Sequence, residues 1–335
     1  MRKLATPVFV VAGLLCNGFL CWTFYGYHTA QMNQPEPCPE APQPEPPSKC
    51  LWLFHEYKPS AFEEDWVKNV QNYQGNACGQ ENMDMSVATQ WVDGATAYNN
   101  GNTSLISAFS RYTFRNNCSG EISVDYIEPL AGLTRHPYFC LKGADWIVNK
   151  DYLVVSWNVT RKASGNSYYF DLGASLYDSG AGGASQAWFV EMYERRGIIW
   201  DGIFSWEMQN WPPSEVWAKI PKHLKPVYHW YNIPVNPEED HPDNPLNYIK
   251  RTAKVEDFVL LKIDIDNGPI ETALVSQLIA SNELMSLVDE FYYEHHVNVG
   301  AMHPYWGAGW PETLADTYAI FNSIRQRGIL AHSWV

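Results

Sequence analysis

The sequence predicts an α/β protein with a Rossmann-like, doubly wound, mostly parallel sheet. An N-terminal membrane helix and a leading region of irregular α+β structure are expected to precede this sheet. Three observations predict this organisation. Short, almost wholly apolar runs alternate with helical segments after residue 165, which is typical of parallel sheets covered by helices. An apolar run occupies residues 4–27. The 335 residues are 46% hydrophobic and include 15 Trp, 20 Tyr and 14 Phe, which excludes disorder throughout.

Residues 1–30 are predicted to be a cytoplasmic tip and a signal-anchor transmembrane helix. Arg2 and Lys3 precede the apolar run, and no further Lys or Arg occurs before Lys49, so the N-terminus is expected to stay in the cytoplasm. The alternative is a cleaved signal peptide, whose apolar region normally spans only about 7–15 residues and ends in small residues. Here residues 24–28 read Phe-Tyr-Gly-Tyr-His, a poor cleavage site.

Residues 31–49 are predicted to be an extended stalk, because prolines alternate with glutamates there. The anchor, the stalk and a globular part together predict a single-pass type II membrane protein of the Golgi or secretory-pathway lumen. Sequons at Asn102, Asn117 and Asn158 favour lumenal exposure. In an oxidising lumen, the odd number of cysteines after the anchor leaves one without an intramolecular partner. These cysteines are Cys38, Cys50, Cys78, Cys118 and Cys140.

Residues 50–164 are predicted to be the irregular lumenal leading region, without a chemical motif. Four polar residues lie close together in the sequence there, and we interpret them as members of a solvated loop. They are Asp125, Glu128, Arg135 and His136. Over the whole chain, 23 basic and 37 acidic residues give a net charge of -14, which opposes binding to a phosphate backbone. Nucleic acid is therefore not expected as a partner.

Residues 165–335 are predicted to form the α/β domain. Strands are expected at 168–173, 203–207, 227–235, 258–264, 290–296 and 329–335, and helices at 184–196, 214–223, 246–253, 269–287 and 314–327. Asp171, Glu207, Asp264 and the cluster at 294–296 fall at strand ends. Because ligands of such sheets bind at the carboxyl ends of the strands, these residues predict the position of the site.

Two glycine-containing turns follow the first strand of this domain, at 171–175 and 179–185. Glycines let a ligand approach the backbone, and N–H groups at a helix N-terminus favour a carboxylate or phosphate. Glu207 closes the second strand, where an acid can accept hydrogen bonds from both ribose hydroxyls of an adenosine. The turns and the strand-end acids together predict a nucleoside-cofactor site.

Two motifs resemble those of class I S-adenosylmethionine-dependent methyltransferases of the FkbM type. Residues 170–174 read Phe-Asp-Leu-Gly-Ala, similar to the family's Asp-x-Gly-Ala motif. Residues 261–271 read LKIDIDNGPIE, close to Leu-Lys-Ile-Asp-x-Glu-Gly-x-Glu. The resemblance covers residues 165–335 and implies S-adenosylmethionine as cofactor. The cofactor-binding residues so expected are Asp171, Gly173 and Ala174 at the methionine end, Ser175, Gly180 and Gly182 in the turns, and Glu207 at the ribose.

The chain departs from this family pattern in three places. A longer segment at 176–179 displaces the second loop glycine. Asp266 stands where the family has Glu. A single final strand takes the place of a closing hairpin.

Methyl transfer to oxygen needs in-line positioning and often a base that removes the hydroxyl proton. The candidate catalytic residues are Asp264, which the resemblance places facing the transferred methyl, and His295 and His296, with Glu294 or Asp264 as orienter. The alternative for each histidine is a satisfied, partly buried side chain. The expected acceptor is a glycan hydroxyl or a small molecule. Aromatic rings in loops near the expected site are candidates for stacking on a sugar, and they are Trp211, Trp306 and Trp310.

Two other functions fit the sequence. A type II Golgi glycosyltransferase could use Asp264-Ile265-Asp266 to hold Mn²⁺ against a sugar nucleotide. That function would not require the Asp171-to-Ala174 motif or Glu207. A non-catalytic binding ectodomain could keep the fold without the cofactor. For the methyltransferase itself we predict no metal ligands.

Overall fold

The computed structural model describes residues 15–16, 19–20, 49–73, 78, 83–158, 165–180 and 182–334. The chain divides into two compact units, Met1–Glu45 and Pro46–Val335. In the first unit, two short strands, β1 (Leu15–Cys16) and β2 (Phe19–Leu20), pair antiparallel. The predicted stalk up to residue 48 and most of the predicted membrane helix lie outside the described residues. Within the described part of the chain, every helix is too short or too polar to cross a bilayer.

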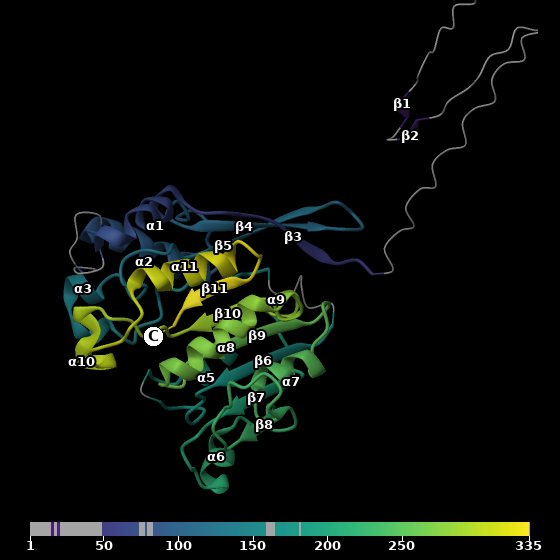
Figure 1. Cartoon of the computed structure of the whole chain (residues 1–335), viewed down its shortest axis with the longest axis vertical. Coiled ribbons are helices and arrows are strands. Elements are labelled where there is room, and N and C mark those ends of the chain that lie inside the picture. Colours follow the sequence, from purple (N-terminus) through teal and green to yellow (C-terminus); the bar gives the residue numbers. More distant parts are fainter. Residues whose placement is uncertain are drawn as a thin grey trace, which may run out of the picture. The chain divides into compact units, whose positions relative to one another are not determined.

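A six-stranded parallel sheet forms the centre of the second unit (Figure 1). Its strands are β6 (Ser167–Leu172), β7 (Gly202–Trp206), β8 (Tyr228–Tyr231), β9 (Phe258–Ile263), β10 (Glu290–Tyr293) and β11 (Leu330–Ser333). They lie in the order β11-β10-β9-β6-β7-β8, and each neighbouring pair is parallel. The prediction of a mostly parallel sheet is confirmed, and the strand order is compatible with a Rossmann-like fold. The chain reverses its direction of strand addition between β6 and β9, and this is the switch point.

In the described part of the chain, eight helices accompany these strands, and the side chains of Asn244, Asn267, Ser281 and Thr313 cap four of them. The helices are α5 (Ser185–Glu194), α6 (Pro213–Lys219), α7 (Pro245–Thr252), α8 (Gly268–Ala280), α9 (Asn282–Leu287), η2 (Gly300–Met302), α10 (His303–Trp306) and α11 (Leu314–Arg325). The single helix expected over 269–287 is divided, because the Ser281 side chain accepts a hydrogen bond from the N–H of Leu284 and so starts a new helix. Thr313 and Asp316 form a reciprocal capping box at the start of α11.

The leading region is more regular than predicted. It contains β3 (Trp52–Lys58), α1 (Ala61–Tyr73), α2 (Met85–Asn99), β4 (Ser110–Asn116), β5 (Ile122–Ile127), α3 (Phe139–Lys142) and η1 (Ala144–Trp146). The three strands make an antiparallel sheet in the order β3-β4-β5. Two disulfides, Cys50–Cys118 and Cys78–Cys140, close long loops in it. Cys38 lies outside the described residues.

The predicted sequons differ in their surroundings. Asn102 and Asn117 are exposed. The amide nitrogen of Asn158 instead donates hydrogen bonds to the carbonyl of Val124 and to the Asp125 carboxylate. A glycan could not replace a hydrogen on that nitrogen without disturbing these bonds.

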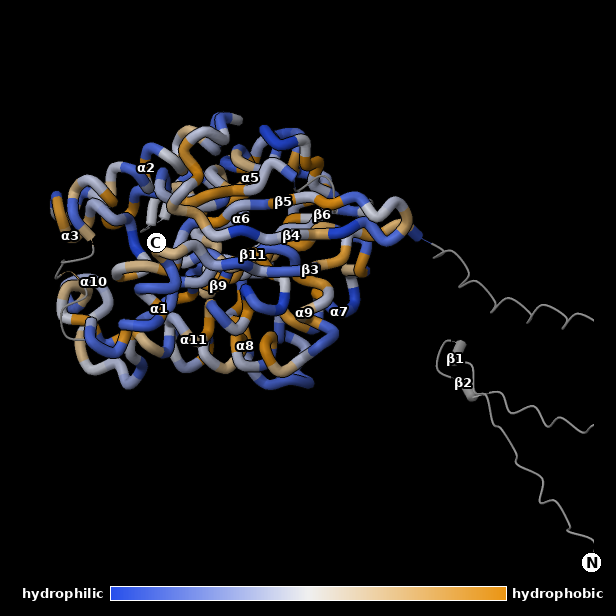
Figure 2. The backbone as a smooth tube through the Cα atoms, turned by 90° about the horizontal axis from the view of Figure 1, so that it is seen from above, coloured by the Kyte–Doolittle hydropathy of each residue, from blue (hydrophilic) through white to orange (hydrophobic). Residues whose placement is uncertain are grey.

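The leading region and the parallel sheet share one hydrophobic core that is rich in aromatic rings. Trp91 on α2 donates its indole N–H to the carbonyl of Tyr152, and the Tyr152 hydroxyl donates to the carbonyl of Ser333 on β11. In Figure 2 hydrophobic and hydrophilic stretches alternate along the chain of this unit. The domain boundary predicted near residue 164 falls in residues 159–164, outside the described part.

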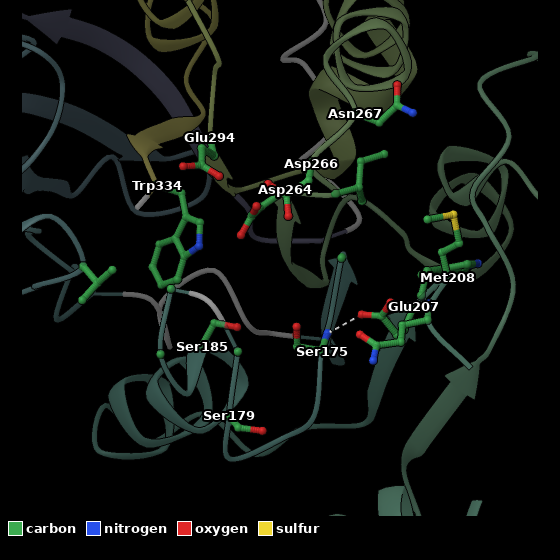
Figure 3. A pocket seen from close by; sticks show the side chains of 18 of the residues that line it. Ser175, Ser179, Ser185, Glu207, Met208, Asp264, Asp266, Asn267, Glu294 and Trp334 are labelled. Atoms are coloured by element: carbon green, nitrogen blue, oxygen red, sulfur yellow. Dashed lines mark hydrogen bonds between the residues drawn. The ribbon is translucent and has the colours of Figure 1, made fainter. Parts of the chain in front are cut away.

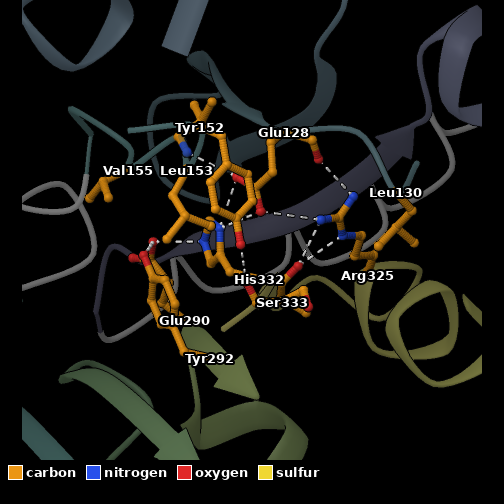
Figure 4. Close-up of polar contacts among 12 residues, drawn as sticks. Glu128, Leu130, Tyr152, Leu153, Val155, Glu290, Tyr292, Arg325, His332 and Ser333 are labelled. Atoms are coloured by element: carbon orange, nitrogen blue, oxygen red, sulfur yellow. Dashed lines mark hydrogen bonds and ion pairs between the residues drawn. The ribbon is translucent and has the colours of Figure 1, made fainter. Parts of the chain in front are cut away.

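A buried ionic network also joins the two parts (Figure 4). Arg325 on α11 lies 3.0 Å from Glu63 on α1. His332 on β11 lies between two carboxylates: its Nδ1 is 2.9 Å from Glu128 Oε1, and its Nε2 is 3.0 Å from Glu290 Oε1. All five side chains are buried. Because each charge has a partner, the network keeps ionised groups inside the protein.

The interpretation of Asp125, Glu128, Arg135 and His136 as a solvated loop is wrong. All four are between 1% and 3% exposed. Their partners are distant in sequence: Glu128 contacts His332, and Arg135 contacts Glu294. Proximity in sequence suggested a polar loop, but all four side chains are buried, and Glu128 and Arg135 pair with charged groups from distant parts of the chain.

Candidate functional site

A cavity of about 910 Å³ opens at the carboxyl ends of the strands on both sides of the switch point (Figure 3). The loop after β6 contributes Gly173 and Ser175, and the segment after β7 contributes Glu207. The loop after β9 contributes Asp264 and Asp266. Further lining residues are Arg135, Gly180, Gly182, Ser185, Met208, Trp211, Glu294, Tyr305, Trp306 and Trp334. The cavity therefore lies where the strand-end acids predicted a site.

Gly173 sits where the loops after β6 and β9 meet. Its φ is +83°, and a Cβ atom at this position would lie 1.6 Å from the carbonyl oxygen of Asp264. Only glycine can occupy such a position without displacing one loop. Ser175, two residues later, also has a positive φ of 51°. Part of this backbone is thus held in a conformation that favours glycine, beside the cavity.

Glu207 connects the second strand to the loop after the first strand. Its Oε2 accepts a hydrogen bond from the backbone N–H of Ser175 at 2.8 Å, and its Oε1 accepts one from the N–H of Gln209 at 2.6 Å. A carboxylate oxygen has two lone pairs, so both oxygens retain acceptor capacity. The carboxylate is fixed in position and lines the cavity.

Lys262 lies beneath the cavity, between two carboxylates. Its Nζ is 3.1 Å from Asp171 Oδ1 and 3.3 Å from Asp264 Oδ2, and it donates to the carbonyl of Gly173 at 2.9 Å. Burial raises the pKa of Asp171 despite this ammonium. Burial also raises the pKa of Asp264 well above its usual range, and the neighbouring Glu294 carboxylate adds to the effect. Asp171 is fully buried and is not among the lining residues, so it supports the loop from below.

Glu294, directly after β10, is fixed by two donors from other segments. Its Oε1 accepts hydrogen bonds from the Arg135 guanidinium and, at 3.0 Å, from the indole N–H of Trp306. Burial disfavours the charged carboxylate, but Arg135 and His296 outweigh it and hold the pKa of Glu294 well below its usual range. Glu294 is therefore a fixed negative charge on the cavity wall.

The two candidate histidines have different surroundings. His295 Nδ1 lies 2.9 Å from the hydroxyl of Thr317 on α11, and burial lowers the pKa of His295 to about 4. His296 Nε2 lies 3.3 Å from Glu294 Oε2 and 4.0 Å from Asp266 Oδ1. Neither histidine is among the lining residues, but His296 contacts two acids that are.

The structure brings most of the predicted cofactor residues to the cavity. Those that line it are Gly173, Ser175, Gly180, Gly182 and Glu207, together with the predicted catalytic Asp264. Ala174 is buried behind the loop. Of the predicted acceptor aromatics, Trp211 and Trp306 line the cavity and Trp310 does not.

Sequence reasoning missed Arg135 and Trp334 as cavity residues. The Arg135 guanidinium donates to the backbone carbonyl of Trp334 at 2.6 Å and pairs with Glu294. The two arginine contacts span 199 and 159 residues of chain. No local pattern marks either residue, because both reach the cavity only through these long-range contacts.

Comparison with models of protein families, with curated proteins and with solved structures finds no match to this chain. The function therefore has to be argued from the site itself.

Proposed function

We propose that this protein is an S-adenosylmethionine-dependent O-methyltransferase that acts on a hydroxyl group of a glycan. The observation that carries the proposal is the charge of the cavity. Glu207, Asp264, Asp266 and Glu294 line it, and the one Lys or Arg side chain among the described lining residues, Arg135, is already paired with Glu294. A cavity lined by carboxylates, with no unpaired Lys or Arg side chain among its described lining residues, favours a cationic sulfonium as ligand over an anionic diphosphate.

The loop after β6 also favours this cofactor over a dinucleotide. The strand order is shared with dinucleotide-binding folds, in which a G-x-G-x-x-G turn brings the pyrophosphate directly to a helix N-terminus. Here residues 173–184 separate β6 from α5, and Gly173 is followed by Ala174 and Ser175 rather than by that pattern. Glu207 remains suited to ribose hydroxyls, which both kinds of cofactor carry.

The chemistry assigned to the site is a single displacement. The acceptor oxygen would form a bond to the methyl carbon while the carbon–sulfur bond breaks. The electron pair of the broken bond would stay on sulfur. The cationic sulfonium becomes a neutral thioether, and the hydroxyl proton passes to a base. Asp264, Glu294 and His296 meet on the side of the cavity formed after β9 and β10, where an acceptor would sit. Trp306 offers a ring there, and Trp211 lines the cavity in the segment after β7.

The proposed setting is the lumen of the Golgi or another secretory compartment, with the chain anchored by its N-terminal segment. The supporting observations are the positive N-terminal flank, the proline-rich residues 31–49 and the two disulfides, which persist in oxidising compartments.

Calorimetry with the full chain, purified in detergent to keep the predicted anchor soluble, tests the proposal. S-adenosylmethionine is titrated into one sample, and a UDP-sugar with Mn²⁺ into another. We expect saturable binding of S-adenosylmethionine alone. Binding of the UDP-sugar alone would favour the glycosyltransferase, and binding of neither by folded protein would favour a non-catalytic ectodomain.

A variant pair then tests the ribose assignment. Glu207→Ala is expected to weaken S-adenosylmethionine binding by about 1–3 kcal/mol, roughly 5- to 150-fold, through loss of buried polar contacts. Glu215→Ala, an exposed acid on α6, is the matched control and should bind as the wild type does. Equal affinities for both variants would show that Glu207 does not hold the ribose.

A further inference from the structure

Three side chains from two neighbouring loops converge beside the cavity. Asp266 follows β9, and Glu294 and His296 follow β10. One potential ligand atom from each lies within 4.8 Å of those of the other two. The separations of His296 Nε2 are 3.3 Å to Glu294 Oε2 and 4.0 Å to Asp266 Oδ1. Two carboxylates and one imidazole are an oxygen and nitrogen donor set typical of divalent cation sites.

His296 provides a second, independent observation. The residue is only 5% exposed, yet within the described part of the chain Nδ1 has no hydrogen-bond partner, and the ion-pair contacts of Nε2 are with the Glu294 and Asp266 carboxylates. The rings of Trp306 and Trp310 pack against it, with centroids 5.2 and 5.1 Å from that of the imidazole. The 3.3 and 4.0 Å distances from Nε2 to the two carboxylates are longer than a charge-assisted hydrogen bond, so this buried imidazole is placed to share a cation with them.

Glu294 is already held as a metal-bound carboxylate would be. Arg135 and Trp306 both donate to Oε1, which leaves Oε2 on the side of His296. Such outer contacts orient ligands and are a regular feature of metal sites. Asp266 differs, because its side chain is 81% exposed and can rotate. The group therefore combines two fixed ligands with one adjustable ligand.

We propose that Asp266, Glu294 and His296 bind one divalent cation of the Mn²⁺ or Zn²⁺ class at the edge of the cavity. Ligand atoms at about 2.1 Å from a metal lie about 3 Å apart when adjacent and about 4.2 Å apart when opposite. The distance from His296 to Glu294 fits adjacent ligands. A small rotation of Asp266 completes the set, and the remaining positions face the cavity.

The place of the cation rests on geometry alone, but the role assigned to it rests on the proposed function. Asp264, beside Glu294 at the end of β9, would stand between the cation and the cofactor. A cation there would bind the acceptor oxygen, orient it toward the methyl carbon and favour loss of its proton. This limits the acceptors to hydroxyls that can reach both the cation and the methyl group, such as those of a sugar diol.

Binding of Mn²⁺ alone, without cofactor or acceptor, tests the site. The full chain in detergent is stripped with EDTA, and the electron paramagnetic resonance signal of free Mn²⁺ is followed during titration. We expect one saturable site per chain. Asp266→Asn should weaken it at least tenfold, and Asp178→Asn, an exposed aspartate paired with Lys219, should leave it within twofold of the wild type.

A second variant tests the nitrogen ligand directly. Pulsed resonance of the bound Mn²⁺ should show coupling to a ¹⁴N nucleus in the wild type and in Asp178→Asn, and His296→Gln should abolish it. Absence of a saturable site in the wild type would overturn the proposal, and so would unchanged binding by Asp266→Asn, whose exposed position lets the variant fold. Because no S-adenosylmethionine is present, failure here is distinct from failure of the methyltransferase function.

Discussion

The buried imidazole of His332 makes the stability of the protein depend on pH in a predictable window. Burial alone would lower the pKa of His332, but Glu128 and then Glu290 outweigh this and raise it to about 9. The perturbation is the double substitution His332→Gln and Glu290→Gln, which replaces a buried ion pair by two neutral amides. Glu128 keeps Arg325 as a partner, 3.6 Å away, in this variant.

The expected magnitude follows from the pKa of His332. Each pKa unit corresponds to about 1.4 kcal/mol, so a rise from 6.5 to about 9 corresponds to about 3 kcal/mol of folding free energy. The folded protein holds its proton more tightly than the unfolded chain does. This stability is therefore fully present below pH 6.5 and is lost as the pH rises through about 9.

The assay is urea unfolding of the full chain in detergent between pH 6 and pH 10, followed by tryptophan fluorescence. The difference in unfolding free energy between the wild type and the double variant should fall by about 3 kcal/mol across this range. His223→Gln is the control, because this histidine is exposed and contacts Glu194 at the surface. Its difference from the wild type should stay nearly constant.

Two results would refute the reasoning. A wild-type advantage that does not change with pH would mean that His332 is not charged in the folded protein. An advantage that grows as the pH rises would mean that the neutral imidazole is the favoured form, contrary to its position between two carboxylates.

Three further predictions concern the loops and the leading region. Gly173→Ala should cost at least about 2 kcal/mol more than Gly101→Ala in urea unfolding, because both glycines have φ of +83° but only the first would bring a Cβ against backbone. Equal costs would contradict the close approach of the two loops. Burial raises the pKa of Asp264 well above its usual range, so the folded protein holds this proton more tightly than the unfolded chain does, and the wild type should lose stability relative to Asp264→Asn as the pH rises above about 4; a wild-type advantage that grows with pH in urea unfolding would contradict this direction. Replacing Cys50 and Cys118 together by Ala should cost about 4 kcal/mol, from the loop entropy of a 68-residue separation. An unchanged unfolding midpoint would show that this disulfide is not formed.

The local pattern of apolar and polar residues was sufficient to predict the alternation of strands and helices. Near-continuous apolar runs such as residues 258–263 are typical of buried strands of a covered parallel sheet, and the structure confirms them. The positions of Glu207 and Asp264 followed from the rule that strand ends meet at one edge. The same local pattern did not predict the break between α8 and α9 at Ser281. The break depends on one hydrogen bond, which the Ser281 side chain accepts from the N–H of Leu284, and apolar periodicity does not reveal it.

The sequence by itself thus determined which strands form the parallel sheet and which acids their ends carry, because periodicity and turn residues act over a few positions. Only the tertiary structure decided how charges are paired. Arg135 was interpreted as part of a solvated loop, yet it fixes Glu294 across 159 residues of chain. The grouping of Asp266 with Glu294 and His296 depends likewise on β9 and β10 lying side by side. A buried charged side chain needs a partner of opposite charge. Which residue becomes that partner depends on which residues lie close in space, and the sequence alone does not give this.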